Sequence, residues 1–215
     1  AILNCIAMES RCENCIIRQF NSLRALSKEE LKKVSNAKIS KKIKKGDALF
    51  SEGQKLDGVY CVRNGVSKLS KLSSNGKEQI VKLTNRGEIM GQRSVIAEDY
   101  TNLGATAIND MEVCFIPKEI ITTTLNTNPY FSLEVLRHMA HDLKEADDVI
   151  VNMSQKTVKQ RLAEALLYLR QNYGEDENGF LLLTLSRDDY ANIVGAATES
   201  LIRMLSDFKN GEFDK

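Results

Sequence analysis

The sequence of 215 residues contains only two prolines, and it shows no low-complexity segment and no internal repeat. A chain of this length and apolar content can bury a hydrophobic core, so we expect a globular protein. It has no run of about eighteen apolar residues, so no transmembrane helix is predicted. The first residues also lack the charged and then apolar segments of a signal peptide. We therefore expect a cytoplasmic protein that has no membrane partner.

Cysteines are few, and their number is odd. The five are Cys5, Cys12, Cys15, Cys61 and Cys114. In a chain of this size such a set argues against a disulfide framework, and it predicts thiols or metal ligands instead.

An excess of charge of one sign is also missing, because the formal net charge is +1. This value gives no overall attraction to nucleic acid or membrane, so any such role depends on a local surface. The patterns of enzymes are absent as well: there is no Ser/His/Asp set, no metal triad and no phosphate loop. The segment GEIMG has the spacing of neither a Walker loop nor a G-x-G-x-x-G fingerprint. We expect a protein that is not an enzyme.

Residues 43–116 carry short β-rich segments, which are VYCV, KLSKL, QIVKL and VCFI. Turn signals separate them roughly every 8 to 12 residues, and two of these signals are Asn-Gly pairs, which support tight hairpins. The pattern predicts an antiparallel β-roll of the sandwich or jelly-roll kind. The capping box SKEE predicts a short helix before it. The lysine run at 38–45 is expected to be a solvated strand edge.

After Pro117 the pattern becomes helical. Asn128-Pro129 combines a capping side chain with a proline at the first helical position, and it predicts a long helix to about Ser154. Its apolar seam advances by three and four residues and consists of Val135, Met139, Leu143, Ala146, Ile150 and Met153. This heptad-like seam favours pairing with a second chain, although packing on the chain's own β-roll would give the same pattern. Because Ala146 places no acid in the seam, we expect a homodimer even without an effector.

The last part of the chain contains two short predicted helices joined at a glycine. A helix over about residues 155–173 precedes them, and FLLLTL after Asn178-Gly179 predicts a short strand. The capping-box variant SRDD starts the first short helix, Gly195 ends it, and the second begins about three residues later. This order is typical of a helix-turn-helix.

On the second short helix the polar side chains lie opposite the apolar ones. Thr198, Glu199, Ile202, Arg203 and Ser206 form the outer face, and Leu201, Leu205 and Phe208 form the inner face. Arginine can bind guanine O6 and N7, and a carboxylate can accept from cytosine N4, so the outer face suits a major groove. A surface salt bridge between Glu199 and Arg203 explains the same pair equally well. Residues 155–215 contain eight Lys and Arg against ten Asp and Glu, which does not favour DNA.

The order of these parts, together with three motifs, resembles the Crp/Fnr family of bacterial transcription regulators. The motifs are GEIMG, the Ile116-Pro117 pair after a hydrophobic strand, and RDDYANIVGAATESLIRML. The last contains an element similar to the family pattern I-x-G-x-x-x-E-T-x-x-R. The resemblance covers residue 12 to the end and implies an α+β fold. Its expected parts are a cyclic-nucleotide-binding-like β-roll in residues 1–127, a dimerisation helix in 128–154 and a winged helix-turn-helix in 155–215.

The resemblance also implies a function, which is that of a homodimeric transcription regulator. Such a protein binds palindromic double-stranded DNA and works with RNA polymerase. Glu199 and Arg203 match residues that read bases, and Arg187 and Thr198 match residues that contact the DNA backbone or neighbouring bases. Ser200 stands where the family usually has threonine. Since the sequence stops at GEFDK, only the first strand of the family's wing is expected.

The members that bind cyclic AMP share residues that this chain lacks. Where they have a glutamate and an Arg-Ser pair, this chain has Gln92 and Asn102-Leu103, and Ala146 stands where they have a threonine. A cyclic phosphate needs a cation and backbone donors. The β-roll is therefore expected to take an unidentified effector other than cyclic AMP. Its candidate pocket consists of Gly91, Gln92, Arg93, Ser94, Asn102 and Leu103. Arg93 could hold another anion or could be solvated.

Other members of the family hold an iron–sulfur cluster on four cysteines. Cys12, Cys15 and Cys114 match three of them, but Asn21 stands where the remaining one is expected. Because the set is incomplete, the sequence requires no cofactor and assigns no metal ligand. Cys5 could complete the set only with a different spacing, and Cys61 and Cys114 are expected to be small buried hydrophobes.

Two functions from different classes thus remain. The first is the homodimeric DNA-binding regulator. The alternative is a redox- or metal-responsive sensor that uses Cys12, Cys15 and Cys114 and has weakened or lost DNA binding. His138 and His141, the only two histidines, are expected to be exposed.

Overall fold

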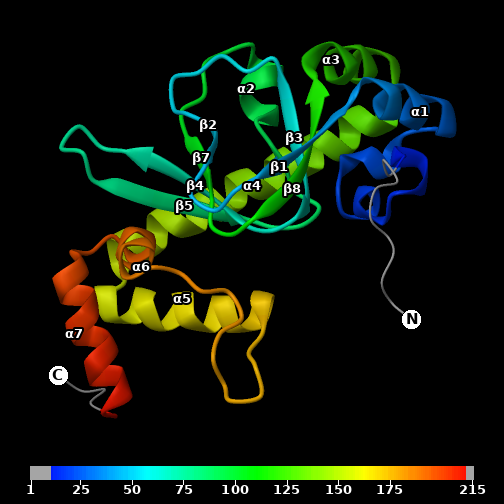
Figure 1. Ribbon diagram of the computed structural model, residues 1–215. Coiled ribbons are helices and arrows are strands. Elements are labelled where there is room, and N and C mark those ends of the chain that lie inside the picture. Colours follow the sequence, from blue (N-terminus) through cyan, green and yellow to red (C-terminus); the bar gives the residue numbers. More distant parts are fainter. Residues whose placement is uncertain (1–10, 212–215) are drawn as a thin grey trace. The chain divides into compact units, whose positions relative to one another are not determined.

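The computed structural model describes residues 11–211. Its helices and strands are η1 (Cys12–Asn14), η2 (Ile16–Phe20), η3 (Ser22–Ala25), α1 (Lys28–Ala37), β1 (Ile39–Ile43), β2 (Ala48–Phe50), β3 (Gly58–Asn64), β4 (Ser67–Leu72), β5 (Glu78–Thr84), β6 (Ile89–Met90), α2 (Gln92–Ala97), β7 (Gly104–Ala107), β8 (Met111–Pro117), α3 (Lys118–Thr127), α4 (Pro129–Gln155), α5 (Val158–Tyr173), α6 (Arg187–Val194) and α7 (Thr198–Lys209). Figure 1 labels the α-helices and all of these strands except β6.

The described residues form two compact units. The first comprises the chain up to Leu69 together with Lys82–Leu143, and the second comprises Ser70–Val81 and the chain from Lys144 onward. Helix α4 contributes to both.

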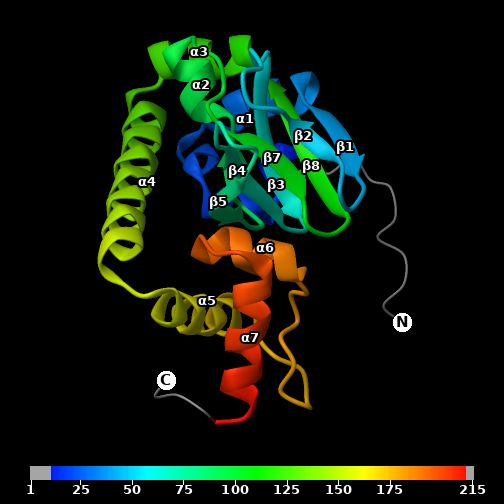
Figure 2. The ribbon, with the colours of Figure 1, turned by 90° about the vertical axis from the view of Figure 1, so that its left-hand side faces the viewer.

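Two four-stranded sheets confirm the predicted antiparallel β-roll. One has the strand order β1-β8-β3-β6 and the other β2-β7-β4-β5, and Figure 2 labels all of these strands except β6. The predicted Asn-Gly turns do connect strands, and Gly65 has a φ of +89°. A Cβ at this glycine would lie 2.7 Å from the carbonyl oxygen of Asp110, so both conformation and space require glycine there.

Buried side chains from both sheets form the core of the first unit, and its N-terminal turns and α1 pack on the same cluster. Val59, Val62 and Val113 are fully buried, as expected for central strands. Strand β1 lies at the edge of its sheet, and its lysines are exposed, which confirms the predicted solvated edge.

The predicted helix starts are confirmed by their caps. Ser27 and Glu30 form a reciprocal capping box at α1. At α4, Asn128 Oδ1 accepts hydrogen bonds from the backbone N–H groups of Tyr130 and Phe131, each at 3.0 Å. Each cap satisfies backbone donors that have no partner within the helix.

Helix α4 departs from the predicted seam at its first turns. Val135 is 4% exposed and belongs to the core of its own unit, so it is not available to a second chain. The adjacent Leu136 is 62% exposed instead. Residues next to each other on a helix point about 100° apart, so packing of Val135 on the β-roll turns Leu136 outward. Met139 also packs partly on the core, whereas Leu143, Ala146 and Ile150 are exposed.

The second unit is mainly helical. Its helix α5 begins with a capping box of Thr157 and Gln160 and ends at Gly174, close to the predicted bounds. The predicted strand over FLLLTL is wrong: among the described residues of this segment, one isolated bridge joins Glu175 and Leu181. Leu183 and Leu185 are buried although they lie in no strand, so burial of individual side chains accounts for the apolar run. Residues 212–215, where the first strand of a wing was expected, lie outside the described residues.

Candidate DNA-reading helix and sensor sites

Helices α6 and α7 are joined by the tight turn that the sequence predicted. Gly195 caps α6 in the left-handed conformation, with φ at +66°, and α7 begins at Thr198. Glycine adopts this conformation without the steric cost that a Cβ imposes. The turn lets the two helices pack on each other, and Val194 of α6 and Leu201 of α7 are fully buried.

Side chains of the second unit hold the ends of α6 in place. Ser186 and Asp189 form the predicted capping box at its start. At its other end the guanidinium of Arg161 donates to the carbonyl oxygen of Val194 at 2.9 Å, and it also donates to those of Met153 and Lys156. Gln79 Nε2 donates to the carbonyl oxygen of Asn192 at 2.7 Å. Helix α6 is thus fixed at both ends by hydrogen bonds.

The two faces of α7 are divided as the sequence predicted. Leu201 is fully buried, while Glu199, Ser200, Ile202, Arg203 and Ser206 are exposed. Thr198 donates a hydrogen bond to the carboxylate of Asp188 at 2.7 Å, and Arg187 is exposed at the start of α6. In the part of the chain that the structure describes, no ion pair joins Glu199 to Arg203. Both charged groups therefore face solvent on the surface that would enter a groove.

The structure brings some of the predicted effector-pocket residues together. Gly91 takes a left-handed φ of +83° at the start of α2. Arg93 Nη2 donates to Asn102 Oδ1 at 3.2 Å, at an exposed position. Ser94 is buried, and Leu103 is half-buried. Gln92 instead lines a separate cavity of about 80 Å³ with other residues of the first unit.

An ion-paired lysine occupies the wall of that cavity. Lys82 Nζ lies 3.1 Å from Glu88 Oε1 and 2.8 Å from Asp142 Oδ1. Burial lowers the pKa of Lys82, but the carboxylates of Glu88 and Asp142 raise it by more. The pKa of Lys82 therefore lies above that of an ordinary lysine. Two carboxylates against one ammonium leave a net negative charge, which opposes a phosphate. His138, which was expected to be exposed, is half-buried and lines the cavity.

Four cysteines line a second cavity in the first unit. They are Cys12, Cys15, Cys61 and Cys114, all as free thiols. Burial raises the pKa of the Cys12 thiol, and it raises that of Cys61 to about 12. Cys61 and Cys114 are buried in strands, as predicted, but they also face the two N-terminal cysteines. Cys5 lies outside the described residues.

Sequence comparison divides the chain into two family matches. Residues 40–128 match the cyclic nucleotide-binding domain, and residues 160–212 match the Crp-like helix-turn-helix domain. The second match contains α6, the turn at Gly195 and α7. The chain belongs to the Crp/Fnr family. It is a DNA-binding transcription regulator and not an enzyme.

Relatives of this Crp/Fnr protein include two named regulators. The fumarate and nitrate reduction regulatory protein of Vibrio cholerae is 29% identical over 206 residues, which cover 94% of this chain and 81% of the relative. The transcriptional activator protein Anr of Pseudomonas protegens is 27% identical over 208 residues, which cover 95% and 84%. These relatives match almost the whole chain.

Solved structures of the family show the same fold. A putative transcriptional regulator of the Crp/Fnr family from Eubacterium rectale superposes with a TM-score of 0.75 at 20% identity, over 88% of this chain and 86% of that one. The c-di-GMP-responsive regulator CLP of Xanthomonas campestris gives 0.76 at 16% identity, over 86% and 93%. The predicted fold class, a β-roll followed by a helix-turn-helix, is therefore confirmed.

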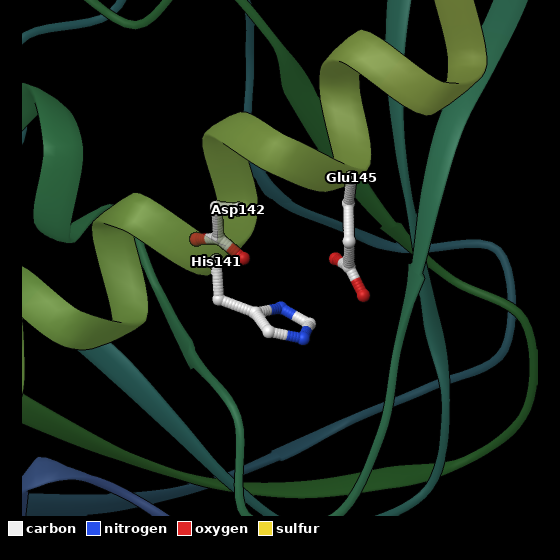
Figure 3. A group of neighbouring side chains, drawn as sticks. All are labelled: His141, Asp142 and Glu145. Carbon is white, nitrogen blue, oxygen red and sulfur yellow. The ribbon is translucent and has the colours of Figure 1, made fainter.

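Two further features of this Crp/Fnr protein concern metal binding. Figure 3 shows His141, Asp142 and Glu145 on α4, where one ligand atom of each lies within 4.8 Å of the others. All three are exposed, and Asp142 already accepts a hydrogen bond from Lys82 at 2.8 Å, so we assign no metal to them. The cysteine cavity is different, because its side chains are largely buried. Sequence reasoning did not place Cys61 there, and only the pairing of β3 with β8 reveals it.

No described helix is long and apolar enough to span a bilayer.

Proposed function

We propose that this Crp/Fnr protein acts in the cytoplasm as a homodimer on palindromic DNA and contacts RNA polymerase there. The observation that carries the proposal is the outward face of α7, on which Glu199 and Arg203 are exposed without an ion pair between them in the described structure. A surface helix with no function in recognition would gain from joining these charges at i, i+4. Their separation leaves both side chains available for base edges.

Each reading residue has a proposed role. Arg203 donates to guanine O6 and N7, and Glu199 accepts from cytosine N4. Arg187, Thr198 and Ser200 contact phosphates or neighbouring bases and fix the register of α7 in the groove. Gly195 sets the angle between α6 and α7.

Dimerisation is proposed through α4. Leu136, Leu143 and Ile150 recur every seven residues and are 62%, 65% and 65% exposed. Ala146 and Met153 follow at the positions that complete a heptad seam. A row of large apolar side chains in water is costly, and a second copy of α4 buries it. We also propose that the chain is divided into a sensor (residues 1–127), a dimerisation helix (128–154) and a DNA-binding part (155–215).

The effector of the β-roll is proposed to be something other than a cyclic nucleotide. The pair of Arg93 and Asn102 is exposed, and the cavity beside Gln92 carries a net negative charge. Its volume of about 80 Å³ is also far below the roughly 300 Å³ of a small ligand site. These features oppose a cyclic phosphate.

Selection of bound sequences from random double-stranded DNA tests the proposal directly. Recovery of a palindrome with half-sites about one helical turn apart is the expected result for a two-fold dimer. Recovery of a single unpaired half-site would contradict dimeric binding, and recovery of no sequence preference would contradict base reading by α7.

A second candidate function is the sensing of a metal or redox signal. The observation that favours it is the cavity that brings Cys12, Cys15 and Cys114 together. Analysis of iron, sulfide and zinc in anaerobically purified protein separates this function from one in which the cysteines only pack. When DNA selection is carried out on the same protein, the metal analysis also shows whether metal sensing accompanies DNA binding or has replaced DNA binding.

A further inference from the structure

The four cysteines of the second cavity come from three separate parts of the first unit. Cys12 and Cys15 bracket the turn η1, where Cys15 N–H donates to the Cys12 carbonyl oxygen at 3.2 Å. A two-residue separation of this kind lets both sulfurs reach one centre. Cys61 lies in β3 and Cys114 in β8. Figure 1 shows the N-terminal turns and these strands.

Strand pairing aligns the two β-strand cysteines. Cys61 and Cys114 are direct partners in the antiparallel register of β3 and β8. Side chains of direct partners point to the same face of a sheet. Arg63 and Ile116, each two residues further along its strand, line the same cavity, which is the period of two expected for one face.

We propose that Cys61 of β3 is the fourth ligand of an iron–sulfur cluster, the cofactor that other members of the family hold, beside Cys12, Cys15 and Cys114. The inference deepens the second candidate function, and it does not depend on DNA binding. Four cysteine thiolates are the usual ligand set of such clusters. The cysteine pattern of the family leaves this chain one ligand short at Asn21, and the fold supplies the missing sulfur from a strand.

Asn21 has a different part at this site. Its side chain is buried, and Nδ2 donates to the carbonyl oxygen of Gly87 at 2.8 Å and to Cys61 Sγ at 3.5 Å. Its Oδ1 accepts from the N–H of Leu23 at 3.0 Å. The residue is thus fixed by backbone groups and donates toward a ligand sulfur. Hydrogen bonds of this kind orient metal ligands and set cluster potentials.

The spacing of the cysteine sulfurs does not match a site for a single tetrahedral ion. In a tetrahedral zinc site the sulfurs lie 2.3 Å from the metal, which places them about 3.8 Å from one another. Among the described residues, no three cysteine sulfurs lie all within 4.8 Å of one another. A cluster of several iron atoms separates its thiolates more widely than one ion does.

The charge around the cavity fits an anionic group. Arg18, Lys38 and Arg63 line it beside the four cysteines. Four thiolates on a dipositive cluster core leave a net charge of about −2, which these cations offset. Arg63 also lies 3.9 Å from Glu112, so part of its charge is balanced already.

The test begins with the full chain, expressed with added iron and purified without oxygen. Iron, acid-labile sulfide and zinc are measured per chain, and the visible absorption spectrum is recorded. We expect iron and sulfide in equal amounts, about two to four of each per chain, with the broad visible band of a cluster. Zinc in place of iron and sulfide, or protein without metal, would overturn the proposal.

Single variants then identify the ligands. Cys12→Ala, Cys15→Ala, Cys61→Ala and Cys114→Ala should each lose most of the iron and sulfide. Cys5→Ala is the matched cysteine control and should retain them. Val62→Ala is the matched core control, because Val62 is fully buried in the same strand but does not line the cavity. It should retain the cluster even if its melting temperature falls.

Two results would reject Cys61 as the fourth ligand. The first is a normal cluster in Cys61→Ala, and the second is loss of the cluster in Cys5→Ala. If Cys61→Ala and Val62→Ala both lost iron and melted alike, the loss would reflect core damage and would also count against ligation. All these readouts are made without DNA, so failure of the cluster and failure of DNA binding are distinguishable.

Discussion

Arg203 is the residue whose change should alter specificity most clearly. Its side chain is exposed on α7, and an arginine bidentate to guanine contributes about 1 to 3 kcal/mol of discrimination. Arg203→Ala should therefore bind the selected palindrome more weakly by that amount. It should also lose its preference at one position of each half-site, as measured by competition with singly substituted DNA.

Lys209→Ala is the matched control for Arg203. It removes the same charge from an exposed position in the last turn of α7. Loss of a general electrostatic contribution weakens binding to all sequences alike, so the preference among DNA sequences should be unchanged. If Arg203→Ala behaved in the same way as this control, base reading by Arg203 would be wrong.

A second residue prediction concerns the acid stability of the first unit. Glu134 is buried on α4, and its carboxylate binds Arg137 Nη1 at 2.7 Å and Arg24 Nη2 at 2.5 Å. The guanidinium groups of Arg137 and Arg24 lower the pKa of Glu134 in the folded protein. The stabilisation is therefore complete above the unfolded pKa of about 4.3, and it is lost as the pH falls through the folded value.

Glu134→Gln should lower the free energy of unfolding at pH 7, and this difference should shrink as the solution is acidified below about pH 4. Denaturant unfolding of both proteins over a pH series measures it. Glu119→Gln removes an exposed carboxylate from α3 and controls for net charge. A difference between Glu134→Gln and the parent that stayed constant into acid would refute the ionic origin of the stabilisation.

At the scale of elements, α4 presents different faces along its length. Its first turns pack on the β-roll through Phe131 and Val135, whereas Leu143 and Ile150 are exposed. An isolated helix of this kind gains stability when its apolar row is covered. Leu143→Glu should therefore convert the proposed dimer to a monomer, as measured by sedimentation at micromolar concentration.

Val151→Glu is the control on the same helix. Val151 is 56% exposed but lies next to Ile150, outside the row that repeats every seven residues. This variant should remain a dimer. Dissociation of both variants would point to general damage of α4, and a parent protein that sediments as a monomer would contradict pairing altogether.

The sequence predicted these elements well where the signals are local. It did not predict contacts between residues that are distant in the sequence. The caps at Ser27, Asn128 and Ser186 and the turn at Gly195 depend on residues within a few positions, and all four are confirmed. Leu136 was missed because the face that α4 buries depends on its neighbours in the fold. FLLLTL was wrongly predicted as a strand because an apolar run cannot show that it has no partner strand.

The cysteines show the same limit in the candidate sensor site. Sequence spacing related Cys12 to Cys15, which are three positions apart, but it could not relate them to Cys61. That relation exists because β3 and β8, about 50 residues apart in the chain, pair in a register that places Cys61 opposite Cys114. A non-local register is a property of the folded sheet, so the fourth cysteine could be found only from the structure.

At the scale of the whole molecule, the proposed dimer needs only one reading helix per chain. Two copies of α7, related by the two-fold axis of the α4 pair, would enter successive major grooves on one side of the DNA. Recognition helices of such dimers bind half-sites about 34 to 36 Å apart, which corresponds to about 10 base pairs. Specificity would then come from the product of two modest half-sites, which suits a chain with a net charge of only +1.

This geometry predicts a strict dependence on operator spacing. Insertion of five base pairs at the centre of the selected palindrome turns one half-site by about half a helical turn, so both α7 helices cannot bind together. With five inserted base pairs, affinity should fall to that of a single half-site. Insertion of ten base pairs returns both half-sites to the same side of the DNA but lengthens the separation between them. Gel-shift titrations of the three DNAs measure this. Equal affinity for the parent and the five-base-pair insertion would mean that each chain binds alone, since a rigidly paired dimer cannot follow the rotation.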